Sequence, residues 1–209
     1  GSPAPLPQAS SAYPSSHRPL PSSSNPAGRT LHPQEAGAPQ KHPSISMAVL
    51  VAARQGRELQ RYSQRTGGRI VVGCIPYRVR CDGELEVLVI TSQKGHGMMF
   101  PKGGWEEDES MDEAARREAL EEAGVLGDTE AVLGFWHYQS RRYVDQTYEG
   151  FMFPLRVADE LHQWPEMASR KRTWASVQQV MDGCSHWWMR EALEQLVARH
   201  AKAKLQSAL

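Results

Sequence analysis

The chain has 209 residues, enough for one domain with a substantial core plus tails. Its 24 basic and 24 acidic side chains give a formal net charge of zero, so the overall charge indicates no particular class of partner. No apolar run approaches the roughly 20 residues that cross a bilayer. Three cysteines (Cys74, Cys81 and Cys184) lack metal-ligand spacing. We expect a soluble protein from a reducing compartment.

Residues 1–46 differ in composition from the rest of the chain. They hold ten of the fourteen prolines and almost no large aliphatic side chains, so they cannot bury enough surface to offset the entropy of ordering. We expect a disordered leader, or a tail that begins with a Gly1-Ser2 cloning scar and ends before Met47. Because Glu35 is its only acid and serine is abundant, an organellar transit peptide is the alternative. The expected localisation is cytoplasmic, with nuclear as second choice and organellar if this stretch is native.

Residues 47–68 read as an N-terminal extension, and the strands begin after it. Two runs rich in Ile and Val, 69–80 and 85–92, predict neighbouring strands. Asp82-Gly83 between them is a hairpin signal. Pro76 cannot donate to a ladder, which favours an edge or a bulge for the first strand.

A glycine-containing loop over 94–99 leads to a predicted acidic helix over 111–123. Three further strands are predicted over 129–138, 147–157 and 172–175. An amphipathic helix over 187–204 follows, with a short tail over 205–209. The apolar residues of this helix, at helical spacing, are Trp188, Ala192, Leu193, Leu196 and Val197. Strands mixed with two helices predict an α/β/α sandwich.

Three carboxylates occupy one side of the acidic helix. An α-helix advances about 100° per residue, so Glu121 and Glu122 return to the side of Glu118. Such a stripe repels itself unless a cation lies in it, and Mg²⁺ takes carboxylates together with water and phosphate oxygens. The stripe predicts a magnesium site for phosphate anhydrides. A solvated surface helix is the alternative for any run of charge.

The spacing around these acids resembles the box of the Nudix hydrolase family. Its specified positions in this chain are Gly103, Glu109, Arg117, Glu118, Glu121, Glu122, Gly124 and Val125. The one departure is Ala119, where the family usually has a larger aliphatic residue. The resemblance covers about 69–200, and it implies an α/β/α sandwich with a mixed β-sheet for a hydrolase domain that we place at 69–204.

The resemblance also implies roles for these residues. In the family the matching glutamates bind the metal, which implies Glu118, Glu121 and Glu122 as ligands of Mg²⁺, with Mn²⁺ as a second choice. Glu121 is the preferred general base, and Glu149 in a later segment is the alternative. The residues that support the box are Gly103, Glu109, Arg117 and Gly124, of which the last fits a left-handed helix cap.

Two further runs, Phe100–Glu106 and Arg170–Trp174, resemble the plant-type branch of the diphosphoinositol polyphosphate phosphohydrolases. This resemblance implies hydrolysis of inositol pyrophosphates, and of diadenosine polyphosphates as well. A substrate with many phosphates needs several cations around it. The candidate substrate-binding residues are Arg78, Lys94, Lys102, Arg141, Arg142, Arg170, Lys171 and Arg172.

Alternative functions stay open at this point. The substrate could be ADP-ribose, NADH or an mRNA cap, and a domain that binds phosphate ligands without catalysis is the non-enzyme alternative; intact box carboxylates argue against the latter. We expect a small polyphosphorylated substrate, no membrane or nucleic-acid partner, and a monomer. The tryptophans near the sheet are assigned to the core: Trp105, Trp174, Trp187 and Trp188.

Overall fold

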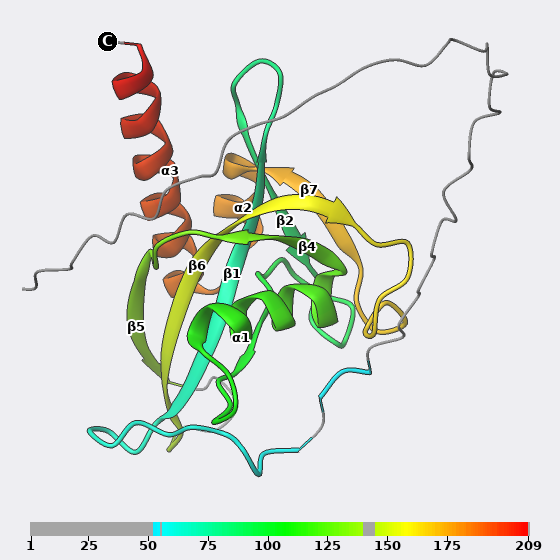
Figure 1. The fold of residues 1–209 in the computed structure, drawn as a ribbon, viewed down its shortest axis with the longest axis vertical. Helices are drawn as coiled ribbons and strands as arrows, with labels where there is room; N and C mark the ends of the chain where they lie inside the picture. Colours follow the sequence, from blue (N-terminus) through cyan, green and yellow to red (C-terminus); the bar gives the residue numbers. More distant parts are fainter. Residues whose placement is uncertain (1–51, 55, 140–144, 209) are drawn as a thin grey trace, which may run out of the picture. The chain divides into compact units, whose positions relative to one another are not determined.

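The computed structural model describes residues 52–54, 56–139 and 145–208 (Figure 1). The predictions for residues 1–46, and for Arg141 and Arg142, lie outside these ranges. Among the described helices, none is both long enough and apolar enough to cross a membrane.

The described strands form one mixed sheet. They are β1 (Arg69–Val79), β2 (Leu85–Ile90), β3 (Lys102–Gly104), β4 (Val125–Thr129), β5 (Gly134–Gln139), β6 (Thr147–Glu160) and β7 (Arg172–Ser176). The order is β4-β6-β1-β2-β7, with β3 paired to β1 and β5 paired to β6. The long central pair β1 and β6 is parallel, whereas β1 pairs with β2 and β3 in the antiparallel sense.

The helices cover both faces of this sheet. They are α1 (Met111–Glu118), which continues into the π-helical turn η1 (Ala119–Ala123), then α2 (Val177–Gly183) and α3 (Trp187–Ser207). Alternate residues of β1 point to opposite faces, so Val72 packs with α1 while Ile75 packs with α3. The predicted α/β/α sandwich with a mixed sheet is confirmed (Figure 1).

Pro76 departs from the prediction, since β1 is a central strand with partners on both sides. On one side β1 pairs with β6 through Pro76 itself. On the other side the partner changes from β3, which ends its pairing at Gly73, to β2, which begins at Tyr77. The proline lies in the gap between these two partners, where a missing N–H breaks no ladder hydrogen bond.

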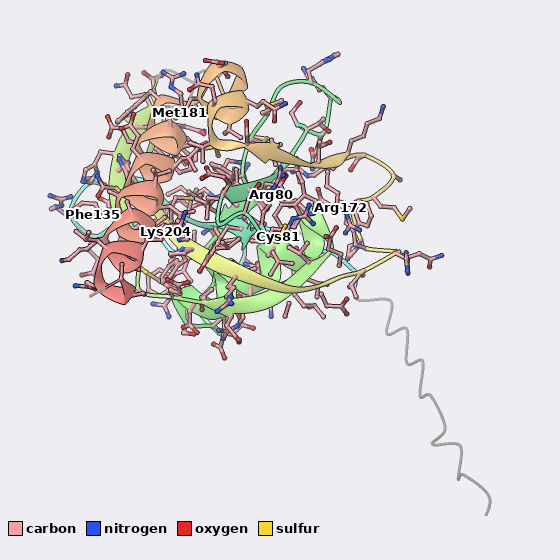
Figure 2. The ribbon with its side chains drawn as sticks, turned by 90° about the horizontal axis from the view of Figure 1, so that it is seen from above. Arg80, Cys81, Phe135, Arg172, Met181 and Lys204 are labelled. Atoms are coloured by element: carbon pink, nitrogen blue, oxygen red, sulfur yellow. The ribbon has the colours of Figure 1, made fainter. Side chains whose placement is uncertain are left out.

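The turns explain most other boundaries. The predicted hairpin joins β1 to β2, with Gly83 at φ 83° and Cys81 exposed (Figure 2). The single strand predicted over 129–138 is wrong, because β4 starts directly after the left-handed Gly124 and β5 follows a separate connection. Glu130 N and Leu133 N of that connection bond to carbonyls of β6.

Two elements were not predicted. β3 is three residues long and contains two glycines, which carry no strand signal. Helix α2 does have a signal, the capping box of Ser176 and Gln179. The closing helix α3 buries most of its predicted apolar set, although Val197 is 36% exposed and lies at the rim of the core.

Candidate active site

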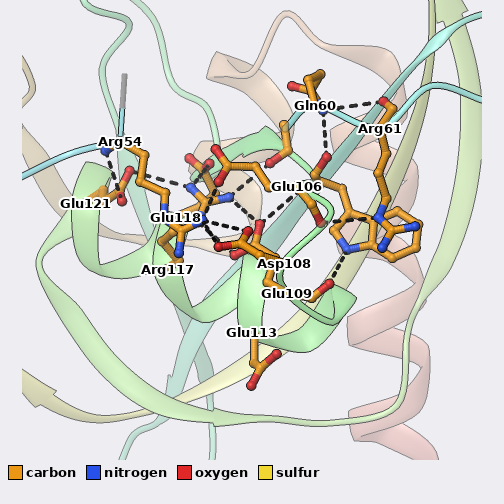
Figure 3. Close-up of polar contacts among 12 residues, drawn as sticks. Arg54, Gln60, Arg61, Glu106, Asp108, Glu109, Glu113, Arg117, Glu118 and Glu121 are labelled. Carbon is orange, nitrogen blue, oxygen red and sulfur yellow. Dashed lines mark hydrogen bonds and ion pairs between the residues drawn. The ribbon is translucent and has the colours of Figure 1, made fainter. Parts of the chain in front are cut away.

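The loop over residues 105–110, which we call the box loop, joins β3 to α1 and is fixed to this helix by local contacts. Ser110 caps the helix by accepting from Glu113 N, and the Glu113 carboxylate accepts from Ser110 N at 2.8 Å. Arg117 donates from Nε and Nη2 to the two oxygens of Glu109, at 2.9 and 2.7 Å. Its Nη2 also donates to Gly104 O at 3.0 Å. This bidentate pair holds the loop against the helix (Figure 3).

The π-helical turn changes how the acids face. Each residue of a π-helix turns less about the axis than a residue of an α-helix, because the hydrogen-bonded ring closes one residue later. Glu122, four residues after Glu118, therefore stays close to the side of Glu118. Glu121 turns less far, but it shares Arg117 with Glu118: Arg117 Nη1 lies 2.6 Å from Glu118 Oε1 and 3.6 Å from Glu121 Oε2. Repulsion from both acids raises the pKa of Glu118, and Glu122 raises it more than Glu121 does.

Glu118 is a strongly perturbed carboxylate. It is 6% exposed, and burial followed by repulsion from Glu122 raises its pKa to about 8 despite the attraction of Arg117. Arg117 Nη1 lies 2.6 Å from its Oε1. A Cβ on Gly103 would lie 2.0 Å from the same oxygen, so the carboxylate rests against backbone that only glycine allows.

Glu122 and Glu121 have separate surroundings. Glu122 accepts from Lys102 N at 2.9 Å and is paired with the buried guanidinium of Arg170. Burial raises the pKa of Glu122, and Lys102 and Arg170 oppose this rise. Glu121 is 4% exposed and accepts from Arg54 N at 3.3 Å. Burial raises its pKa too.

Within the described ranges, no group of three or more His, Cys, Asp or Glu side chains is arranged so that it could hold a metal ion. The donor chemistry nevertheless fits a divalent cation, because Glu118 and Glu122 are buried carboxylates that raise each other's cost of ionisation. Arg117 and Arg170 supply the positive charge beside them.

The alternative general base, Glu149, lies on β6. It accepts from Thr66 Oγ1 at 2.9 Å and lies 3.5 Å from Arg65 Nη2. Burial opposes its ionisation, but hydrogen bonds from Ser63 and Thr66 outweigh burial and lower its pKa. No contact in the described structure joins Glu149 to the box carboxylates.

The structure brings two of the predicted substrate-binding residues to the carboxylates, Lys102 and Arg170. Arg172 instead donates to the carbonyls of Ala123 and Gly124, both at 2.8 Å, and to Leu161 O at 2.7 Å.

The remaining candidates also lie away from the carboxylates. Arg78 is paired with Glu86 at 2.9 Å and lies over the Trp174 ring. Lys94 and Lys171 are exposed in loops. Arg142 is outside the described residues.

A cavity of about 290 Å³ lies beside Lys102 and Gly103, the two residues whose backbones border Glu122 and Glu118. Sequence reasoning missed its second cation, Arg69, whose Nε donates to Gln60 Oε1 at 2.7 Å. None of the described residues that line the cavity is acidic, so no carboxylate of the lining neutralises Arg69 or Lys102. Outside the lining, Lys102 also attracts Glu122. The cavity can accept an anion.

Aromatic rings form another wall of this cavity. Tyr138 stacks between Tyr148 and Trp188, with ring centroids 5.3 and 4.7 Å away. Trp188 is a core residue as expected, but Trp187 is 44% exposed and lines the cavity. The assignment of Trp187 to the core is therefore wrong. Adjacent residues of a helix point about 100° apart, so Trp188 packs in the core while Trp187 does not.

Comparison with known proteins agrees with this geometry. The NUDIX domain family profile matches residues 68–196. Nudix hydrolase 18, mitochondrial, of Arabidopsis thaliana is 55% identical over 157 residues, which cover 72% of this chain and 88% of that protein. Nudix hydrolase 17, mitochondrial, of the same plant is 52% identical over 161 residues, covering 74% and 87%. The chain belongs to the Nudix family and is a Nudix hydrolase of phosphoanhydride-type substrates.

Two more distant proteins complete the comparison. Diphosphoinositol polyphosphate phosphohydrolase 3-alpha of Mus musculus is 33% identical over 105 residues, 49% of this chain and 62% of that protein. A NUDIX hydrolase structure from Nitrosomonas europaea shares the fold at a TM-score of 0.53 and 20% identity, covering 64% of this chain and 90% of that one. Nudix hydrolases in general need divalent metal ions.

The expected cytoplasmic localisation is contradicted by the two plant relatives, which are both mitochondrial. The expectation rested on the lack of an apolar anchor and on unpaired cysteines. Those features do not distinguish the cytosol from the interior of an organelle, because both compartments are aqueous.

Proposed function

We propose that this protein is a Mg²⁺-dependent hydrolase of diphosphoinositol polyphosphates. The observation that carries the proposal is the cavity that Arg69 and Lys102 line, with no acid among its described lining residues. Lys102 and Gly103 of this lining also contact the buried carboxylates of Glu122 and Glu118. A ring that carries many phosphates needs cations that are not already neutralised. The name of the mouse relative supports the same substrate class.

Each group has a role in the proposed reaction. Glu118 and Glu122 would hold the metal, which when bound neutralises phosphate oxygens and lowers the pKa of a water. Lys102 and Arg69 bind and orient the phosphates that do not react. Glu121, which lies beside Arg117 together with Glu118, accepts the proton of the attacking water, and its raised pKa brings it closer to neutral pH, as a general base requires.

A second substrate class is favoured by one observation, the aromatic wall of the cavity. A nucleobase could stack on the exposed Trp187, a contact that an inositol ring cannot form. Diadenosine polyphosphates would use both the wall and the cations. Trp187→Ala should therefore lower turnover of a diadenosine substrate and leave an inositol pyrophosphate unaffected.

A substrate panel tests the proposal. The chain is incubated with Mg²⁺ and 5-diphosphoinositol pentakisphosphate, its 1-isomer, diadenosine hexaphosphate or ADP-ribose, and released orthophosphate and AMP are measured. We expect orthophosphate from the inositol substrates at the highest rates, and its loss in Glu122→Gln. Glu113→Gln is the matched control, because glutamine preserves the capping box on the same helix. Faster turnover of ADP-ribose than of either inositol substrate would refute the assignment.

A further inference from the structure

Residues that precede the family-matched region 68–196 contact residues 105–108 of the loop before α1. We call Arg54 and residues 56–63 the N-terminal strap. Its backbone pairs with the loop: Arg61 N donates to Trp105 O at 2.8 Å, and Glu107 N donates to Leu59 O at 2.8 Å. The strap therefore adds a short pairing to the loop that precedes the catalytic helix (Figure 3).

Arginine side chains fix the strap further. Arg61 donates from Nε to Glu106 O at 3.2 Å and from Nη2 to Glu107 O at 2.9 Å, and its guanidinium lies 4.3 Å from the centre of the Trp105 ring. The Arg54 guanidinium bonds to Glu106 and to Asp108. These contacts hold the strap in one place on the loop.

Gln60 is the buried residue of the strap. It is 8% exposed, and its Nε2 donates to Trp105 O at 2.8 Å and to Ile70 O at 3.2 Å. Those two bonds orient the amide so that its Oε1 accepts from Arg69 Nε at 2.7 Å. A Cβ on Gly104 would lie 1.6 Å from the same oxygen, so the amide is packed against the loop backbone.

We propose that Gln60 is a positioning residue that aims the Arg69 guanidinium into the cavity. A neutral amide orients Arg69 without cancelling its charge, whereas a carboxylate at this place would neutralise the cation that a phosphate needs. The strap thus belongs to the active site, although it lies outside the family-matched region. This inference rests on the proposed role of the cavity in binding phosphate.

A double-mutant cycle tests the proposal. Gln60→Met keeps the side-chain length and removes both the donor and the acceptor, and Arg69→Met removes the cation. We expect Gln60→Met to raise KM about tenfold with little change in kcat. Because Gln60 acts through Arg69, the double variant should have the KM of Arg69→Met alone. Arg57→Ala, elsewhere in the strap, is the control and should leave KM unchanged.

Binding measured without turnover separates this proposal from the proposed function. Titration calorimetry with inorganic pyrophosphate and a chelator measures phosphate binding without metal or turnover. Gln60→Met should raise the Kd for pyrophosphate by the same factor as it raises KM. If melting curves show that Gln60→Met is unfolded, Gln60→Asn replaces it, since one fewer methylene withdraws the amide from Arg69. An unchanged Kd, or effects of the two single variants that multiply in the double variant, would overturn the proposal.

Discussion

The protonation of a single residue, Glu118, should govern how stability depends on pH. Its pKa is raised from 4.5 to about 8 in the folded chain, chiefly by burial and then by repulsion from Glu122. The folded state therefore disfavours the charged form. The contribution of Glu118 to stability is fully present below the unfolded pKa and is lost as pH rises from about 4.5 to 8.

Thermal unfolding with a chelator checks this prediction. Between pH 5 and pH 8 the Tm of the unmodified protein should fall more than the Tm of Glu118→Gln, whose amide stays neutral. Because other groups titrate in both proteins, the difference between the two curves is the measured quantity. Parallel curves for the two proteins would show that Glu118 is not perturbed in the folded chain.

Site residues that are close in the chain could be predicted from the sequence, whereas those brought together by distant strands could not. Glu109 and Arg117 are eight positions apart, so one loop and one helix bring them together, and their spacing is visible in the chain. Arg69 reaches Lys102 and Tyr138 only through the pairing of distant strands. Contacts of that kind depend on the register of the whole sheet, which no local pattern specifies.

At the scale of the elements, the end of the helical segment α1–η1 is held by Arg172, a residue that the sequence had assigned to substrate binding. Arg172 was a candidate for binding substrate, but it donates two hydrogen bonds to the carbonyls of Ala123 and Gly124 at the end of η1 and one to Leu161 O after β6. Its guanidinium also lies 4.2 Å from the Trp164 ring centre. Figure 2 labels this side chain. We infer that Arg172 caps the C-terminal end of the helix, where carbonyls lack partners.

Arg172→Met should therefore lower the free energy of unfolding by about 2–4 kcal/mol, because buried carbonyls lose a charged donor. KM should change little in the fraction that remains folded. Urea unfolding and steady-state kinetics on the same preparation measure both quantities. Lys171→Met, an exposed neighbour, is the control. A raised KM with normal stability would instead assign Arg172 to the substrate.

The π-helical turn η1 is a feature of the helix that the sequence did not predict. Helical spacing alone places Glu118, Glu121 and Glu122 on one stripe, and an α-helix over 111–123 was the natural prediction. The change of helix type begins at Ala119, which is fully buried beneath the turn. No propensity distinguishes an α-helix from a short π-helix, so the change of helix type at Ala119 could not be foreseen.

For the whole molecule, the sandwich places the chemistry where two layers meet. Helix α1 covers one face of the sheet, and α3 with its tryptophans covers the other. β3 lies between them, and its residues Lys102 and Gly103 border both the carboxylates and the cavity. This explains why glycines are needed there: a larger residue at 103 would separate Glu118 from the backbone on which it rests.

The destination of the molecule is a prediction at this same scale. Residues 1–46 are rich in serine and contain one acid, Glu35, against two arginines and one lysine. Transit peptides have this acid-poor character, and the two plant relatives are mitochondrial. A fluorescent protein fused after residues 1–46 should therefore accumulate in mitochondria of plant cells. Fused to residues 47–209 it should not, because these residues lack the serine-rich, acid-poor stretch. Cytosolic fluorescence from both fusions would show that the leader carries no address.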